Sequence, residues 1–255
     1  MAYISERKKL AKIPTIKWDL TALSQAAEYA IERQWAVTNP VTAIPKCPLR
    51  YKTPIFKRPS ARALALGIDC TYGNLKPLAR FLLATGMRLE EAATIERTQI
   101  DRQRKTATLS ETKNGSTRTV SLNNAALEIL KVQALFTDLV FPAIDRVTGE
   151  RRPYKQASTN WQEAQKRASL KAEAQGWTFE RFRLHDLRHI FAIDYLANGG
   201  NIYLLQQQLG HGSIRQTEWY LQFLSPEEQM ATKFGKAQIQ AHPQRFTPSG
   251  NAKND

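Results

Sequence analysis

Cysteine is scarce in this chain: among its 255 residues only Cys47 and Cys70 occur, and they form no C-x-x-C pair. A disulfide framework needs several pairs of cysteines and a zinc finger needs closely spaced ones, so we expect neither. Two free cysteines suit a reducing compartment, and the sequence therefore predicts a cytoplasmic protein.

Long apolar runs are missing as well. No stretch approaches the ~20 apolar residues that a membrane-spanning helix needs, so we expect no membrane partner. The first residues, Met1–Lys9, have no apolar segment after their charges and do not form a secretory signal peptide. A G-x-x-x-x-G-K phosphate-binding loop is also absent, which argues against an ATP-dependent enzyme.

Acidic residues are too few to balance the basic ones. The 23 aspartates and glutamates face 37 lysines and arginines, which gives a formal net charge of +14. Such an excess favours a polyanionic partner, of which nucleic acid is the commonest. A basic protein without a specialised partner is the alternative that charge alone leaves open.

Most segments of the chain carry apolar residues at helical spacing. The length of 255 residues is enough for one large domain or two small ones. Apolar and polar residues alternate instead in Thr106–Leu109 and Arg118–Leu122, as in β-strands. The Asn114-Gly115 pair between these segments is a strong hairpin signal. We therefore predict a mainly α fold with a small antiparallel three-stranded β-sheet, of class α+β. Helices are expected at about 19–35, 75–85, 90–95, 123–134, 159–173, 184–197, 202–209, from 213 through Tyr220, and at 226–240.

Composition also changes along the chain. Residues 1–12 are basic and polar, which predicts a frayed end. Residues 41–60 are rich in proline, lysine and arginine, and we expect a basic extended linker there. This linker either runs along a phosphate backbone or is a solvated spacer. Residues 142–156 are predicted to be a loop and 241–255 a disordered tail.

Arg88 directly follows a tight turn, and Glu91 lies three residues later on the same helical face. An arginine braced by a carboxylate can bind a phosphate with both arms of its guanidinium. An ordinary intrahelical ion pair is the alternative.

Lys113 precedes the hairpin turn, at the tip of a two-stranded finger that could reach into a DNA groove. Arg118 stands across the hairpin, where it would support the turn or contact a phosphate. A solubilising lysine in a turn is the alternative.

His185 and Arg188 share one helical face, and such a pair can donate to a phosphate oxygen or move a proton. A surface contact or a satisfied core histidine is the alternative. His211 lies between two glycines, and Tyr220 follows nine residues later. Tyrosines usually serve packing; as a nucleophile, a phenol with a pKa of about 10 needs help from nearby charges.

Taken together, these motifs resemble the tyrosine recombinase (phage integrase) family, with that family's order and separations. The resemblance covers about residues 36–225, most of the chain. The matching segments are Thr85–Glu91, Thr112–Arg118, His185–His189 and Leu209–His211 with Tyr220 nine residues on, and Gly199–Ile202 supplies the family's Gly-Gly-x-Ile run.

The resemblance implies a tyrosine recombinase catalytic-domain fold at 61–240 and an enzyme that cuts and rejoins DNA through a 3′-phosphotyrosyl intermediate. By this resemblance Tyr220 is the nucleophile. Arg88 and Arg188 bind the two non-bridging phosphate oxygens and offset charge in the transition state. Lys113 protonates the leaving 5′-oxygen as general acid.

The remaining roles are also implied by the resemblance. His185 assists the proton transfer of the phenol, and His211 hydrogen-bonds the phosphate. Glu91 and Arg118 support the site. The family's chemistry needs no cofactor, no metal and no ATP, because arginines supply the positive charge.

The implied partners are double-stranded DNA, three further copies in a homo-tetramer on DNA joined through the C-terminal helix, and an accessory DNA-bending protein. The expected location is the nucleoid of a bacterium or of a phage-infected host. Residues 1–40 correspond only to a remnant of the family's N-terminal helical core-binding domain. Ile190 stands where a threonine is common in the family.

Three other functions compete with this interpretation. A catalytically silent DNA-binding relative would share the basic surface, and a topoisomerase of type IB would share the chemistry. A metallohydrolase using His185, His189 and His211 is disfavoured, because Asp186 replaces the glutamate of H-E-x-x-H and Arg188 would repel a cation.

Overall fold

The computed structural model describes residues 2–44, 56–109, 117–133, 138–145, 147–154 and 157–234. The chain divides into two compact units, Met1–Lys57 and Arg58–Asp255, which are described separately. Lys113, residues 45–55 of the predicted linker and the predicted tail lie outside the described residues. Among the described helices, none has both the length and the apolar character to span a membrane.

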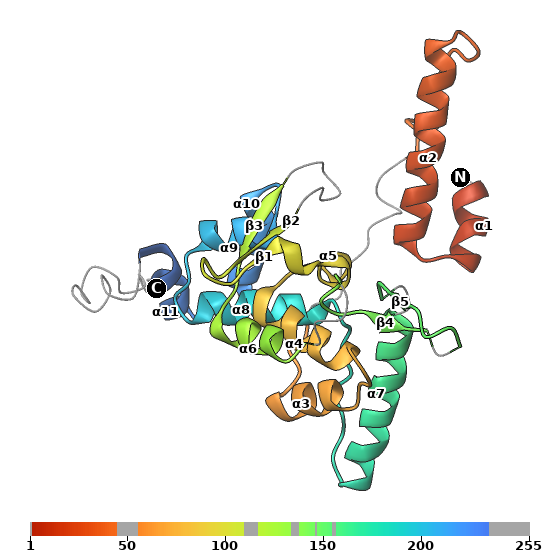
Figure 1. Cartoon of the computed structure of the whole chain (residues 1–255). Coiled ribbons are helices and arrows are strands. Elements are labelled where there is room, and N and C mark those ends of the chain that lie inside the picture. Colours follow the sequence, from red (N-terminus) through yellow and green to blue (C-terminus); the bar gives the residue numbers. More distant parts are fainter. Residues whose placement is uncertain are drawn as a thin grey trace, which may run out of the picture. The chain divides into compact units, whose positions relative to one another are not determined.

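The N-terminal unit contains two helices, α1 (Ala2–Leu10) and α2 (Ile13–Glu32) (Figure 1). Ile4 of α1 is buried with Ile16 and Leu20 of α2. The prediction of a frayed end over residues 1–12 is therefore wrong, because α1 carries an apolar residue that α2 can cover. The second helix also begins six residues before the predicted start at Asp19, with a proline in its first turn, where proline is tolerated.

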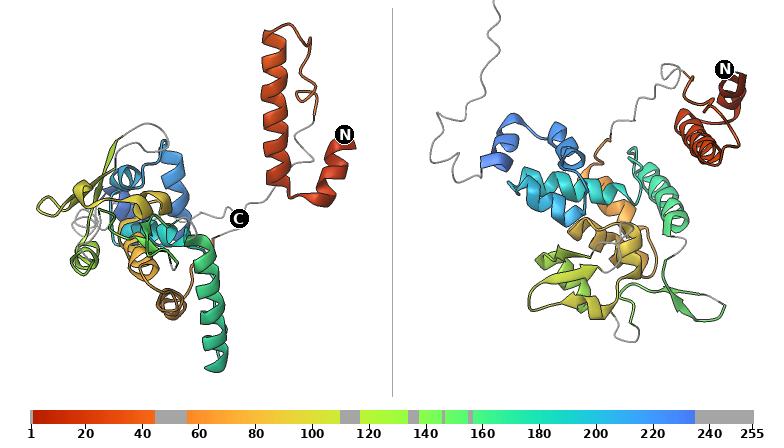
Figure 2. Two further views of the ribbon diagram at one scale, coloured as in Figure 1. Left: turned by 45° about the vertical axis from the view of Figure 1, so that its right-hand side comes forward. Right: turned by 90° about the horizontal axis from the view of Figure 1, so that it is seen from above.

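The second unit is mainly helical with a small antiparallel sheet, which confirms the predicted fold class. Its longest described helix, α7 (Ala157–Ala174), packs against α3 and projects from the rest of the unit (Figure 2). The other described α-helices are α3 (Ala61–Asp69), α4 (Leu75–Thr85), α5 (Leu89–Thr94), α6 (Asn124–Lys131), α8 (Asp186–Ala197), α9 (Ile202–Leu209), α10 (Ile214–Glu218) and α11 (Pro226–Phe234).

The sheet has three antiparallel strands in the order β1 (Ile100–Asp101), β2 (Thr106–Leu109) and β3 (Arg118–Ser121). Leu109 pairs with Arg118, so the register places Arg118 at the end of the hairpin nearest its connection. A short 3-10 helix, η2 (Arg97–Gln99), leads into β1.

Two features of this unit were not expected. Ala143–Ile144 (β4) and Arg151–Arg152 (β5) form a two-stranded ladder where a loop was predicted. Strands of two residues are too short to show an alternation of apolar and polar residues in the sequence. The turn between them is stabilised by hydrogen bonds in which the carboxylate of Asp145 accepts from the amides of Val147 and Thr148. Helix α3 was also missed, although Ser60 caps it by accepting from the amide of Ala63.

Helix α4 is central to this core and packs against α8, α6 and α5. Leu78 and Phe81 are fully buried, and the ring of Phe81 lies 5.1 Å from that of Phe141. Gly86 ends α4 in the left-handed region, at φ 68°, and a Cβ there would overlap the ring of Phe191 on α8. The turn that carries Arg88 therefore lies directly against α8.

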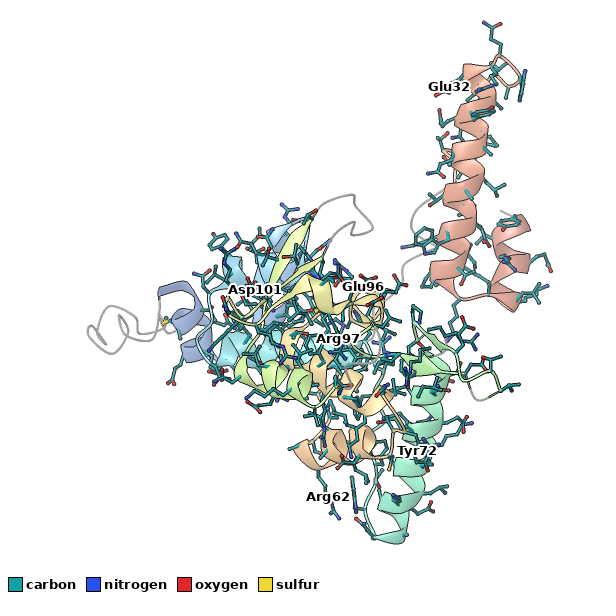
Figure 3. The ribbon with its side chains drawn as sticks, in the orientation of Figure 1. Glu32, Arg62, Tyr72, Glu96, Arg97 and Asp101 are labelled. Carbon is teal, nitrogen blue, oxygen red and sulfur yellow. The ribbon has the colours of Figure 1, made fainter. Side chains whose placement is uncertain are left out.

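Farther from this centre, two arginines stack on aromatic rings. Arg62 and Tyr72, one member of each pair, are labelled in Figure 3. The guanidinium carbon of Arg62 lies 4.2 Å from the ring centroid of Trp177, and that of Arg167 lies 4.3 Å from that of Tyr72. Such cation–π contacts help to join α3 and α7.

Gln208, buried near the end of α9, ties three segments together. Its Oε1 accepts from the amide of Ser121 at 2.8 Å, and its Nε2 donates to the carbonyls of Ser121 and Thr85 at 3.0 and 2.9 Å. The end of α4, strand β3 and the end of α9 are therefore held side by side, and each of them carries or precedes a predicted site residue.

Tyr220 does not lie in the α-helix that Ser213 opens. Ser213 does cap that helix, but α10 ends at Glu218, and Tyr220 belongs to the 3-10 helix η3 (Trp219–Phe223). The expectation of one helix through Tyr220 is wrong because the chain tightens to three residues per turn where this side chain enters the interior. Only 2% of Tyr220 is exposed.

Candidate active site

Glu91 joins two arginines that come from different elements. Its Oε1 accepts from Nη1 of Arg88 at 3.0 Å, and its Oε2 accepts from the backbone amide of Arg88 and from Nη2 of Arg118. Burial favours the neutral acid and is the largest single influence on the pKa of Glu91. The hydrogen bonds and the charge of Arg118 nevertheless outweigh it and lower that pKa, so Glu91 is a carboxylate at neutral pH.

Arg88 stands immediately before α5 and keeps part of its guanidinium accessible. Nη1 is held by Glu91, Nη2 donates to the carbonyl of Gly210 at 2.8 Å, and 40% of the side chain is exposed. An arginine fixed on one side and open on the other can accept an anion without a large loss of side-chain entropy.

Arg118, on β3, is held more tightly than Arg88. Its Nη2 donates to Glu91 at 2.5 Å, its Nη1 donates to the carbonyl of Gln208 at 3.0 Å, and only 11% of the side chain is exposed. A Cβ on Gly210, which has φ 65°, would overlap this guanidinium. Burial lowers the pKa of Arg118, but the neighbouring Glu91 opposes that change.

Arg188, on α8, is buried and bridges two turns that are distant in sequence. Nη1 donates to the carbonyl of Gly86 at 2.7 Å and Nη2 to that of Leu209 at 2.6 Å. Burial, followed by the charge of Arg88, lowers the pKa of Arg188 to about 10. The side chain is therefore still cationic at neutral pH.

Tyr220 lies among three aromatic or imidazole rings. Its hydroxyl is 3.0 Å from Nδ1 of His189, and its ring is nearly parallel to that of His211, at 7° and 6.3 Å between centroids. Trp219 contacts both His189 and Tyr220 edge-on or tilted. Burial raises the pKa of Tyr220, whereas the positive charge of Arg188 acts to lower it, so this phenol lies within the field of that arginine.

The three histidines near Tyr220 are uncharged at neutral pH. Burial is the main cause in each case: it lowers the pKa of His185, and it lowers those of His189 and His211 to about 4. Nearby arginines add to the effect. Nδ1 of His211 is also 2.9 Å from the hydroxyl of Thr217, a fully buried residue one helical turn before Tyr220.

Comparison with known proteins identifies the family of the chain. The model of the phage integrase family matches residues 63–225. The chain belongs to the phage integrase family. The resemblance inferred from the sequence motifs is thereby confirmed.

Named relatives include the integrases of Haemophilus phage HP1 and Salmonella phage P22, each 29% identical to this integrase-family chain. The matches cover 79% and 75% of the chain but 53% and 49% of those proteins, so the chain spans about half their length. Among solved structures, a lambda integrase dimer bound to a core site superposes with a TM-score of 0.64 at 19% identity, covering 86% of this chain and 75% of that one. The Tn1549 transposon integrase gives 0.62 at 18% identity, covering 85% and 77%.

Seven of the eight candidate residues lie in the described part of this integrase-family chain, and contacts link them. Arg88, Glu91 and Arg118 form one ion-pair cluster, and the carbonyls of Gly210 and Leu209 connect it to Arg188. Tyr220 is linked to these residues by the stacking of its ring on that of His211 and by the charge of Arg188. His185 is linked to Tyr220 through His189, whose ring lies edge-on to that of His185 at 5.0 Å. Lys113 lies outside the described residues.

The sequence did not reveal the contact between His189 and Tyr220. The sequence interpretation gives His189 a role only as a metal ligand, yet its ring contacts the hydroxyl of Tyr220. Its position directly after Arg188 and four residues after His185 was the available signal. In the described ranges no group of three or more His, Cys, Asp or Glu side chains is placed to hold a metal ion.

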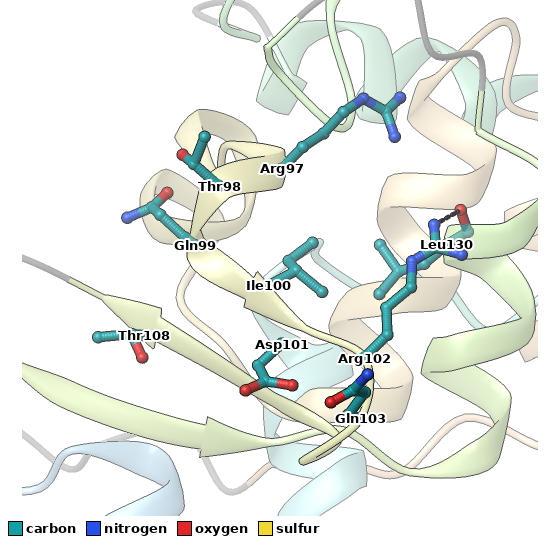
Figure 4. Close-up of a pocket in the computed structure, with 9 residues that line it drawn as sticks. All are labelled: Arg97, Thr98, Gln99, Ile100, Asp101, Arg102, Gln103, Thr108 and Leu130. Carbon is teal, nitrogen blue, oxygen red and sulfur yellow. Dashed lines mark hydrogen bonds between the residues drawn. The ribbon is translucent and has the colours of Figure 1, made fainter.

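A pocket of about 560 Å³ lies elsewhere in the second unit (Figure 4). It is lined by residues of η2, β1 and the following turn, together with Thr108 of β2 and Leu130 of α6. Nη2 of Arg102 donates to the carbonyl of Leu130. It contains none of the candidate site residues.

Proposed function

We propose that this chain is a site-specific DNA recombinase that cuts and rejoins double-stranded DNA through a 3′-phosphotyrosyl intermediate at Tyr220. The observation that carries the proposal is that the phenol of Tyr220 lies within the field of Arg188, and Arg188 within that of Arg88, in a chain of the phage integrase family. Cations placed where negative charge develops are the main requirement for attack on a phosphodiester.

In the proposed reaction the oxygen of Tyr220 forms a bond to phosphorus and the bond to the 5′-oxygen breaks. Arg88, with its accessible face, and Arg188 bind the non-bridging oxygens. Lys113 protonates the leaving 5′-oxygen. The reverse attack by another 5′-hydroxyl restores the phosphodiester, so the energy of the bond is conserved and no ATP is consumed.

In the proposed site His211 hydrogen-bonds the phosphate, His185 assists the proton transfer of the phenol, and Glu91 and Arg118 brace the arginines. A neutral imidazole can donate a hydrogen bond to phosphate without adding charge. Metal is not part of this proposal, because the arginines supply the positive charge.

The proposal extends to partners. The proposed substrate is double-stranded DNA. Four copies of this chain assemble on the DNA through their C-terminal helices, and an accessory protein bends the DNA. Residues 1–40 belong to a helical core-binding region, and 41–60 link it to a catalytic domain at 61–240. The cytoplasm, at the nucleoid, is the expected place of action.

The proposal is tested by covalent capture. The native chain is incubated with a pool of nicked suicide duplexes that have random arms, and adducts resistant to denaturation are recovered and sequenced. The native chain should form adducts, and Tyr220→Phe, which lacks the nucleophilic oxygen, should form none. Tyr203→Phe is the matched control because Tyr203 is 64% exposed, and it should react as the native chain does. Adducts with Tyr220→Phe would overturn the assignment.

A catalytically silent DNA-binding relative is the second candidate. It is favoured by the burial of Tyr220, since a side chain that is 2% exposed reaches a phosphate only if its neighbours move. Salt-dependent binding of the same duplexes without any adduct would identify this function.

A further inference from the structure

The hydroxyl of Tyr220 has one closely placed imidazole, and it belongs to His189. The separation of 3.0 Å between Nδ1 and the hydroxyl oxygen is that of a hydrogen bond. His185, the residue expected to assist proton transfer, lies one helical turn earlier, and its ring meets that of His189 at 5.0 Å. The group in contact with the reacting oxygen is therefore not the one that the family motif suggested.

The ring of His189 is fixed in place on three sides. The ring of His185 lies edge-on against it, that of Trp219 is 5.3 Å away, and that of Tyr220 is 5.7 Å away. Both Trp219 and Tyr220 belong to η3, which packs on α8. A base whose rotamer is locked by packing holds its hydrogen-bond partner in one geometry, as a positioned nucleophile requires.

Electrostatics keep this imidazole unprotonated at neutral pH. Burial, then the neighbouring His185, lowers the pKa of His189 to about 4, while Asp186 acts in the opposite direction and Arg183 and Arg188 add to the decrease. The ring is therefore neutral before DNA arrives and has one unprotonated nitrogen. A bound phosphate would bring negative charge beside Arg188 and would raise the proton affinity of His189 when the phenol must lose its proton.

We infer that His189 positions the hydroxyl of Tyr220 and accepts its proton as the oxygen attacks phosphorus. This inference rests on the proposed function. In the step, the O–H bond of Tyr220 breaks and its proton passes to Nδ1, while the O–P bond forms and the bond to the 5′-oxygen breaks. That oxygen receives its proton separately, from Lys113. In the reverse step the imidazolium returns the proton to the phenolate.

Two substitutions separate positioning from proton transfer. In His189→Asn the amide oxygen can replace Nδ1 as acceptor but cannot take the proton, whereas His189→Ala removes both functions. Using the duplexes captured by the native chain, we expect His189→Asn to slow single-turnover adduct formation by about a hundredfold or more, the usual contribution of a general base, and His189→Ala to be slower still because positioning is lost as well. Thermal unfolding of each variant shows whether the fold is retained.

A chemically altered substrate separates this role from that of the leaving-group acid. A duplex with sulfur in place of the bridging 5′-oxygen has a leaving group that needs no protonation. It should restore the rate of Lys113→Ala and leave His189→Asn slow. Restoration of His189→Asn by sulfur, or a native rate for His189→Asn with the ordinary duplex, would overturn the inference. Failure of the native chain to form any adduct would instead refute the proposed function, and the inference with it.

The hydrogen on His189 can be observed without DNA. Nitrogen-15 NMR of the native chain, with His189→Asn to assign the signals, should report Nδ1 as the unprotonated nitrogen and Nε2 as the one carrying hydrogen. A proton resident on Nδ1 would make His189 a donor to the tyrosine oxygen and would rule out its action as the base.

Discussion

Replacing Glu91 with glutamine should destabilise the protein far more than a single surface charge normally does. The carboxylate is 13% exposed and is shared by Arg88 and Arg118, and Arg118 is 11% exposed. Glutamine keeps the shape but removes the charge, and it leaves Arg118 buried near two other arginines without its counter-ion. Loss of one partner from a buried ion pair costs roughly 3–5 kcal/mol.

A loss of that size corresponds to a decrease in Tm of roughly 6–20 °C, because 1 kcal/mol shifts Tm by about 2–4 °C in a domain of this size. Urea and thermal unfolding of the native chain and Glu91→Gln measure it. Glu90→Gln is the matched control: Glu90 is the adjacent, exposed residue of the same helix, and its substitution should change stability by no more than about 0.5 kcal/mol.

The difference between the two proteins should also depend on pH. The pKa of Glu91 is lowered in the folded state, so its contribution is complete above the ordinary glutamate pKa of 4.5 and is lost as pH falls through the lowered value. Native and Glu91→Gln should therefore converge in stability in acid. Equal urea midpoints at pH 7, or a gap that does not narrow in acid, would refute the reasoning that the carboxylate compensates the buried arginine.

Three further predictions concern the elements around this cluster. Gly210→Ala should destabilise the protein by about 1–2 kcal/mol for the left-handed backbone alone, and should lower adduct yield because the new methyl group displaces Arg118; urea midpoints and covalent capture measure the two effects. Asn123→Ala should cost about 0.5–2 kcal/mol in urea unfolding, since it removes the cap of α6, and an unchanged midpoint would contradict the assigned cap. EDTA should leave adduct formation at its original rate, and loss of activity that zinc or magnesium restores would count against charge stabilisation by arginines.

Part of this site could be read from local sequence. Gly86 and Gly210 end helices in the left-handed region, as glycines after an apolar helical repeat are expected to do, and α9 has the predicted bounds. Asn123, the first residue of the helix expected at 123–134, caps α6 by accepting from the amide of Ala126. These features depend on residues within one or two turns, so sequence alone specifies them.

Other features depended on segments far apart in sequence. The expectation that η3 would continue α10 was wrong because the burial of Tyr220 among rings from α8 is a tertiary matter. Arg188 receives its acceptors from Gly86, 102 residues before it, and from Leu209, 21 residues after it. The packing of α1 on α2 and the pairing of β4 with β5 likewise depend on contacts between separate segments, which the local residue pattern does not specify.

The sequence by itself determined the family, the mainly helical fold and the identity of the charged residues, because motif order and apolar periodicity are properties of the chain alone. Only the tertiary structure decided which imidazole meets the hydroxyl of Tyr220. His185 and His189 lie on adjacent turns of one helix, and the choice between them depends on how η3 packs across α8. That packing is set by long-range burial rather than by residue spacing.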